Sequence, residues 1–389
     1  MADAESLLNP VLEKIAKDEE YDNYKKEVTL IYSGGANYTS QLFNITLSAT
    51  GKDDLKLFAK VAVMGEKMRS LTTMQVFETE IMFYTTILSN YREYEQKYNF
   101  PKEDRLVLPK YFGGSTEYMK ETLVLEDLTA KGYQPFDRFT CFDWEYASKC
   151  VSVLARLHAL SIRFEKDNPK LFEDIIAKLG FQLPMDEMKD FMERGVASAI
   201  GVTVDENKEK LGKFIKDNLS DESCINFYNP KRKVCLNHGD FRPSNVMHKR
   251  DENGNIKVVV IDYQVLQKGN PVTDLLYFLI GGSDEEFRDK HLRQYFDHYY
   301  EEFSKTLHRL EVDPDEVYTK ADFDSDVDEM LPFGVIIGMF TLPFITVDVE
   351  NAPKLEDGIE LESFAMELSE LFKTRFNGLV NSYVKMGIL

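Results

Sequence analysis

The chain has 389 residues, a formal net charge of −20 at pH 7, and hydrophobic side chains at 43% of its positions. This length is too great for one simple core, so we expect two lobes, and the apolar content argues against a disordered chain. The negative charge argues against nucleic acid and anionic membranes as main partners, because both are polyanions.

The first third of the chain predicts a small antiparallel sheet that carries one long helix. Apolar residues at helical spacing predict a first helix over 5–26, and period-two alternation then predicts strands. The predicted strands are 28–32, 41–49, 55–63, 106–112 and 121–125. Residues 70–98 predict the long helix, with Phe77, Glu80 and Tyr84 on one face.

The rest of the chain is predicted to be mainly helical. The predicted helical regions are 142–164, the charge-rich segment 165–230, and 272–389. Two short strands are expected within 234–264. Because the composition changes near 126–132, we predict an N-terminal lobe over 1–126 and a C-terminal lobe over 127–389, which gives an α+β fold.

The N-terminus and the cysteines indicate a cytoplasmic protein. The first residues, Met-Ala-Asp-Ala-Glu-Ser, lack the basic and apolar stretches of a signal peptide. The four cysteines, at positions 141, 150, 224 and 235, have no CxxC spacing and are expected to be reduced thiols. The longest uncharged run, 331–347, contains two prolines and two glycines, so a buried core helix is expected there and not a membrane span.

The span 238–262 carries the strongest functional signal. Asp240 is followed five residues later by Asn245, and a hydrophobic strand then ends in Asp262. In kinases with this layout, one carboxylate meets the attacking hydroxyl, while an amide and a second carboxylate hold Mg²⁺ on the nucleotide. An ordinary turn would explain the first Asp but neither Asn245 nor Asp262. The pattern therefore favours an ATP-dependent phosphotransferase.

Two weaker features could bind the nucleotide phosphates. In Ser-Gly-Gly-Ala-Asn, the backbone around Gly34, Gly35 and Asn37 could approach a triphosphate closely, although such a sequence alone is more typical of a simple hairpin turn. Lys60 lies within an apolar strand. It is either an outward-facing lysine of an edge strand or a phosphate-binding cation paired with Glu80 of the long helix.

Three further features of the sequence allow two interpretations each. Glu126 and Leu128, which flank Asp127, either mark the acidic end of a strand or offer backbone groups to an adenine edge. His238 is interpreted as a structural loop histidine, since Asp240 already supplies a base. Asp274 either caps a helix or braces the catalytic loop from below.

Together these motifs resemble those of the ecdysteroid kinase-like family over roughly residues 28–345. The motifs that carry the resemblance are His238-Gly-Asp240-x₄-Asn245, Ile261-Asp262-Tyr263-Gln264, Pro271-x-x-Asp274-Leu-Leu-Tyr-Phe-Leu, Gly35-Ala-Asn-Tyr-Thr-Ser40, Phe-Ala-Lys60-Val, Phe77-x-x-Glu80-Ile-x-Phe-Tyr84, Val-Leu-Glu126-Asp127-Leu128 and Leu-Ala-Arg-Leu-His158-Ala-Leu. The resemblance implies a two-lobed protein-kinase-like fold, shared with choline kinases and aminoglycoside phosphotransferases. It also implies ATP and Mg²⁺ as cofactors and a small-molecule hydroxyl as acceptor, with ecdysteroids as the type substrate.

By matching position, the resemblance assigns Asp240 as the catalytic base, Asn245 and Asp262 as Mg²⁺ ligands, and Lys60 as a phosphate ligand. The chain departs from the family where Leu-Trp usually follows His-Gly-Asp. Here Arg242 stands two residues after Asp240, where protein kinases carry a lysine that neutralises the transferred phosphate. We therefore predict a catalytic role for Arg242.

Three alternatives compete with a kinase of lipophilic alcohols. A cationic alcohol such as choline is the chief alternative acceptor, and a non-catalytic nucleotide-binding scaffold is the alternative from another class. A protein kinase is disfavoured, because only eleven residues separate Asp262 from Asp274 and no Ala-Pro-Glu follows. That segment is too short for a peptide-docking activation loop.

Overall fold

The computed structural model describes residues 4–32, 40–63, 75–179, 185–220, 222, 223, 227, 232–350 and 368–389. The side chains of 185–188 are also outside this description. The predicted phosphate-contacting residues Gly34, Gly35 and Asn37 lie outside the described residues. All statements about the structure below concern the described part.

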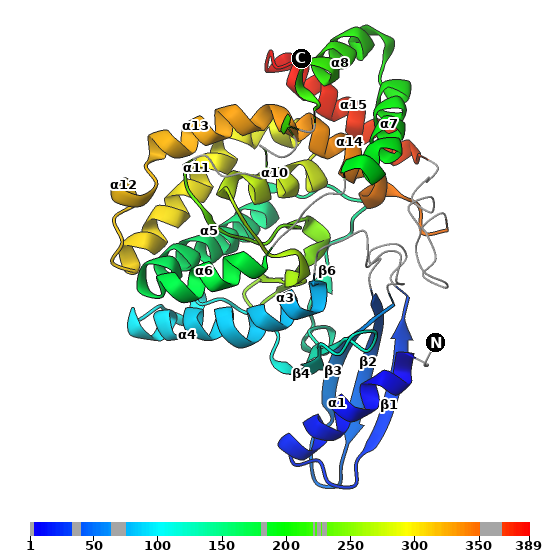
Figure 1. The fold of residues 1–389 in the computed structure, drawn as a ribbon, viewed down its shortest axis with the longest axis vertical. Coiled ribbons are helices and arrows are strands. Elements are labelled where there is room, and N and C mark those ends of the chain that lie inside the picture. Colours follow the sequence, from blue (N-terminus) through cyan, green and yellow to red (C-terminus); the bar gives the residue numbers. More distant parts are fainter. Residues whose placement is uncertain are drawn as a thin grey trace.

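The N-terminal part is built on an antiparallel five-stranded sheet, drawn at the lower end of Figure 1. Its strands are β1 (Lys25–Ile31), β2 (Ser40–Ser48), β3 (Leu55–Ala62), β4 (Tyr111–Ser115) and β5 (Thr122–Glu126), in the order β1-β2-β3-β5-β4. Helix α1 (Ala4–Asp18) covers one face with a core that includes Leu12, Leu57 and Ala59. Since side chains alternate along a strand, Lys60 points to the opposite face.

The long helix on that opposite face has a π-helical turn in its middle. Its parts are α3 (Val76–Met82), the π turn η1 (Phe83–Ile87) and α4 (Leu88–Lys97). Figure 1 shows α3 and α4 along the boundary between the sheet and the large helical part. In the π turn, the ring of Phe83 stacks on Tyr263 with centroids 3.5 Å apart. The turn thus packs the helix against segment 238–264, which carries the predicted catalytic residues.

The remaining part is mainly helical. Its helices are α5 (Trp144–Asp167), α6 (Pro169–Lys178), α7 (Met185–Val202), α8 (Asp205–Asn218), α10 (Pro271–Gly282), α11 (Glu285–Arg309), α12 (Pro314–Val317), α13 (Lys320–Met330), α14 (Gly334–Thr346) and α15 (Glu370–Lys385). Short 3₁₀ turns lie at η2 (Lys102–Asp104), η3 (Thr129–Lys131), η4 (Pro243–Asn245), η5 (Tyr263–Val265) and η6 (Leu331–Phe333). The predicted α+β class, with a small sheet, one long helix and a larger helical part, is confirmed.

Two small sheets hold the catalytic segment on the helical part. They consist of β6 (Gln134–Pro135), β8 (Val246–Arg250) and β9 (Ile256–Val260), and of β7 (Cys235–Asn237) with β10 (Gln267–Gly269). The antiparallel β8–β9 hairpin begins directly after Asn245 and ends just before Asp262. The N–H of Ile261 donates to the carbonyl of Asn245 at 2.9 Å. The hairpin thereby brings the two predicted metal ligands to the same end.

Two predicted boundaries are wrong. The first helix ends at Asp18 and not at 26, because Glu20 and Asn23 adopt left-handed backbone conformations that cannot continue an α-helix. The fourth strand covers Tyr111–Ser115 and not 106–112, since Pro109 cannot donate to a strand ladder. Neither change alters the order of the elements.

One stretch in the described part, 320–346, is long and apolar enough to cross a membrane by length and composition alone. Its first half is the acidic α13, and Pro332 separates that helix from α14. Of its most apolar 18-residue window, 56% is buried inside the protein. Helix α14 packs against α10 and α15, as expected for a core helix. The three cysteines in the described part are free thiols.

Candidate active site

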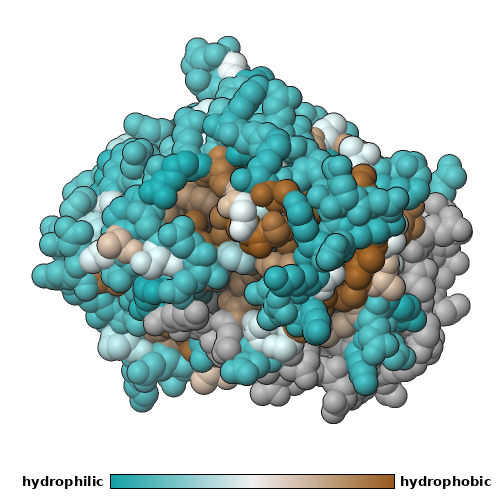
Figure 2. All heavy atoms as spheres, turned by 90° about the horizontal axis from the view of Figure 1, so that it is seen from above, coloured by the Kyte–Doolittle hydropathy of each residue, from teal (hydrophilic) through white to brown (hydrophobic). Residues whose placement is uncertain are grey.

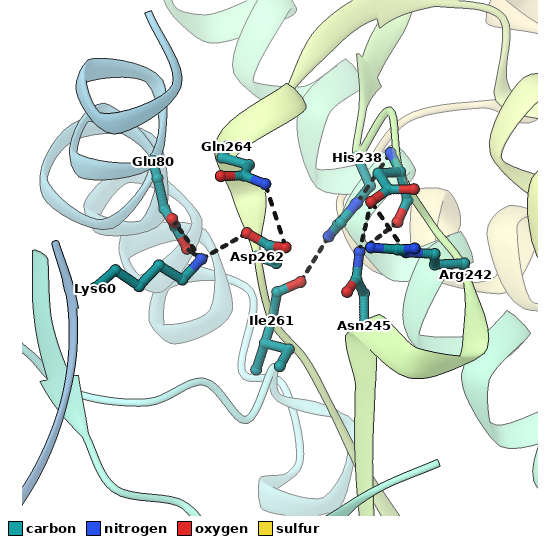
Figure 3. Close-up of polar contacts among 9 residues, drawn as sticks. Lys60, Glu80, His238, Arg242, Asn245, Ile261, Asp262 and Gln264 are labelled. Atoms are coloured by element: carbon teal, nitrogen blue, oxygen red, sulfur yellow. Dashed lines mark hydrogen bonds and ion pairs between the residues drawn. The ribbon is translucent and has the colours of Figure 1, made fainter. Parts of the chain in front are cut away.

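A buried lysine joins the sheet to the catalytic segment. The Nζ of Lys60 lies 2.8 Å and 3.1 Å from the two carboxylate oxygens of Glu80, and 2.5 Å from Oδ1 of Asp262. Figure 3 shows Lys60 and Glu80 approaching Asp262 from one side. Because β3 is paired on both edges and Lys60 is only 8% exposed, the interpretation as an outward-facing edge lysine is wrong.

This cluster has one more carboxylate than it has cations. Burial alone would lower the pKa of Lys60, but the carboxylates of Asp262 and Glu80 outweigh burial and raise it. Burial raises the pKa of Glu80 to about 7, and the attraction of Lys60 only partly offsets this. Burial would also raise the pKa of Asp262, but Lys60 holds it below its ordinary value. Asp262 therefore carries the more persistent negative charge of the two.

Asp262 has a left-handed backbone conformation, with φ 71° and ψ 60°. This conformation turns the chain at the end of β9, directly before the 3₁₀ turn η5. Asp and Asn tolerate it better than most other residues with a β-carbon. The Nε2 of Gln264 lies 3.5 Å from the second oxygen of Asp262, at the outer limit for a hydrogen bond. Gln264 was part of the recognised motif, but the sequence indicated no role for it.

The catalytic loop brings Asp240, Arg242 and Asn245 together. The amide nitrogen of Asn245 donates to both the backbone carbonyl and Oδ2 of Asp240, each at 2.9 Å. The Nε of Arg242 lies 3.2 Å from the same Oδ2. Arg242 and Asn245 lie on the other side of the Ile261–Asp262 segment from Lys60 (Figure 3), and Asp240 contacts both of them. The predicted base thus contacts one cation and one amide donor.

Asp274 braces this loop from within the protein core. One of its oxygens accepts the N–H of His238 at 2.7 Å, and the other accepts the N–H of Gly239 at 3.0 Å. The ring of His158 lies 3.2 Å from the first oxygen and 2.7 Å from the hydroxyl of Tyr299. The cap of α10 is instead Asn270, whose side chain accepts from Val272 N–H. Of the two interpretations of Asp274, the geometry favours the brace.

His238 has structural contacts, as expected from the sequence. Its Nε2 lies 2.9 Å from the carbonyl of Ile261, and its Nδ1 accepts the N–H of Asp240 at 3.3 Å. With Nδ1 acting as acceptor, the tautomer protonated on Nε2 fits both contacts. The ring thereby links the catalytic loop to the segment that carries Asp262.

Asp240 has the properties that a general base needs. Its side chain is about three-quarters buried, and this burial raises its pKa above the ordinary value, with Arg242 acting in the opposite direction. A raised pKa strengthens the carboxylate as a proton acceptor near neutral pH. A carboxylate in this environment could accept a proton from a hydroxyl group placed within hydrogen-bond reach.

The residues present fit a magnesium ion. Because the amide nitrogen of Asn245 is turned toward Asp240, its carbonyl oxygen is directed elsewhere (Figure 3). Asp262, whose pKa is lowered by Lys60, offers carboxylate oxygen. No cluster of three or more His, Cys, Asp or Glu suited to a metal occurs among the described residues. Mg²⁺ commonly takes one or two carboxylates and completes its shell with phosphates and water, so the oxygens of Asp262 and Asn245 are donors of the kind that would hold it.

Several backbone groups of segment 126–128, which is predicted to face the adenine, form hydrogen bonds within the protein. Glu126 N–H donates to Lys110 O at 2.8 Å, and Asp127 N–H donates to Lys56 O at 3.2 Å. The carbonyl of Leu128 accepts from Lys131 and Tyr133. The base-binding role of Glu126 and Leu128 stays a prediction, as do the individual roles of the other site residues.

Comparisons with known proteins give one family match and several similar solved structures. Residues 34–312 match the model of the ecdysteroid kinase-like family. A search of curated proteins finds no match. Among solved structures, the chain is similar to the GDP complex of aminoglycoside 2′-phosphotransferase-IIIa, with 10% identity, 84% of this chain and 98% of that chain covered, and a TM-score of 0.39. It is also similar to a microcompartment-associated aminopropanol kinase, with 11% identity, 97% and 99% covered, and a TM-score of 0.43.

Proposed function

Since the chain belongs to the ecdysteroid kinase-like family, we propose that it transfers the γ-phosphate of ATP to a hydroxyl group of a small molecule. The proposed acceptor is a lipophilic alcohol such as an ecdysteroid. The observation that carries this proposal is the joint presence of Lys60, Asp240, Asn245 and Asp262 around the Ile261–Asp262 segment, with Lys60 already held by Glu80.

Each residue has a defined part in the proposed reaction. Lys60 binds the nucleotide phosphates, and Asn245 and Asp262 hold Mg²⁺, which neutralises phosphate charge when it is bound. Asp240 accepts the proton of the acceptor hydroxyl, whose oxygen forms a bond to the γ-phosphorus. The bond between that phosphorus and the β–γ bridging oxygen breaks, and ADP leaves. Arg242, beside Asp240, stabilises charge on the phosphoryl group in transit.

The segment after Asp262 supports a small acceptor over a protein. Protein kinases carry their peptide-docking loop at this position. Here the chain forms the short turn η5, pairs β10 with β7, and begins α10 at Pro271. Gln267 and Gly269 of β10 are buried. We therefore propose a small-molecule acceptor, with the nucleotide bound against lobe 1–126 and the acceptor against lobe 127–389.

The proposal is tested by offering ATP and Mg²⁺ with ecdysteroids, with choline or ethanolamine, and with generic protein substrates, and by detecting phosphorylated products by mass spectrometry. We expect product from the ecdysteroid set in wild type and none in Asp240→Asn. Phosphorylation of the protein set alone would overturn the small-molecule proposal, and preference for choline would overturn the lipophilic acceptor. Nucleotide binding without any product would support the non-catalytic scaffold.

A further inference from the structure

We propose that Tyr146 of α5 is a positioning residue for Asn245, the proposed magnesium ligand. Its hydroxyl group holds the 3₁₀ turn η4, the last residue of which is Asn245. This inference rests on the proposed function and extends it to a side chain that acts through the backbone of the turn.

The hydroxyl of Tyr146 meets the backbone on both sides of Asn245. It lies 3.0 Å from the carbonyl oxygen of Val246 and 3.4 Å from that of Pro243. A tyrosine hydroxyl has one proton to donate, so the nearer carbonyl, that of Val246, is the better acceptor. Because Val246 directly follows Asn245 in the chain, this bond fixes the backbone where the amide side chain is attached.

The β8–β9 hairpin directs the carbonyl of Val246 toward this hydroxyl. The carbonyl of Asn245 accepts the N–H of Ile261 across the hairpin. Successive residues of a strand direct their carbonyls to opposite edges, so that of Val246 points away from β9. On that edge, β6 pairs only with the two residues that follow Val246. A buried carbonyl needs a donor, and Tyr146 supplies it.

The ring of Tyr146 is held by other rings, so its hydroxyl has a fixed position. Its centroid lies 4.6 Å from that of Phe136, 5.4 Å from that of His248 and 6.4 Å from that of Phe278. Its backbone N–H donates to Asp143, the N-cap of α5, at 2.8 Å. Although apolar residues reach the surface on the face drawn in Figure 2, Tyr146 is only 4% exposed. The hydroxyl therefore serves groups inside the protein.

A second support of the turn comes from α10. A methyl group on Gly282 would clash with the rings of Pro243 and Phe142, and one on Gly281 would lie 3.5 Å from Cδ of Pro243. Only glycine at position 282 lets Pro243 lie so close to the α10 backbone. The turn η4 is thus contacted by α10 at its first residue and by the hydroxyl of Tyr146 beside its last.

The position of this turn decides where the side chain of Asn245 lies. Its amide nitrogen donates to the backbone carbonyl and Oδ2 of Asp240, each at 2.9 Å, which leaves the carbonyl oxygen for a metal (Figure 3). Mg²⁺ demands near-ideal octahedral geometry with short bonds. Loss of a group that orients a metal ligand typically lowers metal affinity about 10–100-fold. Removal of the Tyr146 hydroxyl should therefore weaken the binding of Mg²⁺.

The test compares wild type with Tyr146→Phe, which keeps the ring and removes the hydroxyl. Tyr300→Phe is the matched control, because Tyr300 of α11 is also buried and its hydroxyl donates to the carbonyl of Tyr318 at 2.9 Å. ATP is titrated calorimetrically at a series of Mg²⁺ concentrations. We expect the Mg²⁺ concentration needed for half of the gain in ATP affinity to rise about tenfold in Tyr146→Phe. ATP binding without Mg²⁺ should not change, and the control should match wild type.

Asn245→Ala, measured in the same way, separates this inference from the proposed function. If Asn245→Ala raises the Mg²⁺ requirement while Tyr146→Phe matches wild type, the positioning role is overturned and the metal role of Asn245 stands. An unchanged Mg²⁺ requirement in Asn245→Ala would overturn that metal role in the proposed function.

Hydrogen exchange without any ligand measures the positioning itself. The N–H of Asn245 donates to the carbonyl of Arg242, and the N–H of Ile261 donates to that of Asn245, each at 2.9 Å. We expect both amides to exchange faster in Tyr146→Phe but not in Tyr300→Phe. This result would support the positioning of Asn245 even if Asn245→Ala leaves the Mg²⁺ requirement unchanged. Equal exchange in all variants would overturn it.

Discussion

The Lys60 cluster and the catalytic loop lie on either side of the Ile261–Asp262 segment, but they are held in different ways. In the cluster, one ammonium group is shared by two carboxylates, so the arrangement depends on protonation and charge. In the loop, the backbone N–H groups of His238 and Gly239 are fixed by Asp274, which is itself fully buried.

Because of this difference, a ligand can rearrange the Lys60 cluster, whereas the catalytic loop is already held in position. A bound nucleotide and Mg²⁺ would bring new charges to Lys60 and Asp262, and the surplus negative charge of the cluster would then be redistributed. In the loop, by contrast, the carboxylate of Asp274 is held by two fixed backbone N–H donors and the ring of His158, which a nucleotide at Lys60 would not displace. Substitutions in the two parts should therefore differ in their pH and ligand dependence.

The largest effect is expected in the loop, from Asp240→Asn. The amide can still accept from Asn245, so the loop should keep its shape, but the proton acceptor is lost. We expect turnover to fall by at least about 10³-fold while MgATP binding persists. Initial rates and calorimetric titration with MgATP measure the two quantities. Asp251→Asn in the exposed β8–β9 turn is the control, and comparable turnover in both variants would exclude Asp240 as the base.

Asp274→Ala tests whether the loop is held rigidly from below. Removal of this carboxylate leaves two backbone N–H groups and the ring of His158 without their acceptor. We expect the free energy of unfolding to drop by about 3–5 kcal/mol, as measured by denaturant titration. Asp284→Ala is the matched control, because Asp284 accepts one N–H, that of Phe287, at an exposed helix start. It should cost only about 1 kcal/mol. Equal losses would contradict the brace.

Arg242→Ala tests whether the guanidinium group of the catalytic loop contributes to phosphoryl transfer. We expect the barrier to phosphoryl transfer to rise by about 2–4 kcal/mol, seen in kcat, with little change in the KM for ATP. Arg250→Ala at the far end of β8 removes an exposed arginine that pairs with Glu145. In that control, the activation free energy derived from kcat should change by less than about 0.5 kcal/mol. An unchanged kcat in Arg242→Ala would show that the side chain has no part in transfer.

The last expected effect concerns Glu80 of the Lys60 cluster, whose contribution to the free energy of unfolding depends on pH. The native pKa of Glu80, about 7, exceeds its ordinary value of 4.5, so the native protein binds more protons here than the unfolded chain between these pH values. This contribution to stability is fully present below pH 4.5 and is lost as the pH rises through 7.

Glu80→Gln removes that titration. The free energy of unfolding of wild type relative to the variant should therefore decrease by up to about 3 kcal/mol from pH 4.5 to pH 7.5. Denaturant titrations across this range measure the difference. Thr79→Ser, on the neighbouring helical position, should show no such trend relative to wild type. A difference that grows with pH would mean that Lys60 stabilises the charged form of Glu80.

Much of this arrangement was predictable because it depends on spacing. The alternation in β3 and the helical period of α3 made Lys60 and Glu80 candidates for an ion pair. The predicted hairpin between Asn245 and Asp262 indicated that these two residues lie at the same end of the hairpin. The contact of Lys60 with Asp262 was not predictable, since it joins residues 202 positions apart across two parts of the fold. The same holds for Arg242 at Asp240, where only the folded loop reveals the direction of the side chain.

The helix boundaries, the π turn and the packing of α14 show what the sequence pattern could not predict. The helical spacing of apolar residues predicted a helix that continues past Asp18. In the structure Glu20 has a left-handed backbone conformation, which ends the helix and which apolar spacing cannot predict. The π turn that begins at Phe83 coincides with the stacking of its ring on Tyr263, a tertiary contact that helical periodicity cannot predict. The apolar run of α14 predicted a core helix, but only the folded structure shows that its partners are α10, α15 and α7.

The left-handed backbone of Asp262 has a consequence for how this protein could lose its activity. A non-glycine residue in this conformation costs about 1 kcal/mol or more relative to glycine. Asp262 also supplies the second carboxylate beside the single ammonium group of Lys60. Replacement by glycine would relieve the backbone and leave Lys60 and Glu80 as a balanced pair. At this position, a substitution that relieves the backbone would also remove the carboxylate that we propose as a ligand of Mg²⁺.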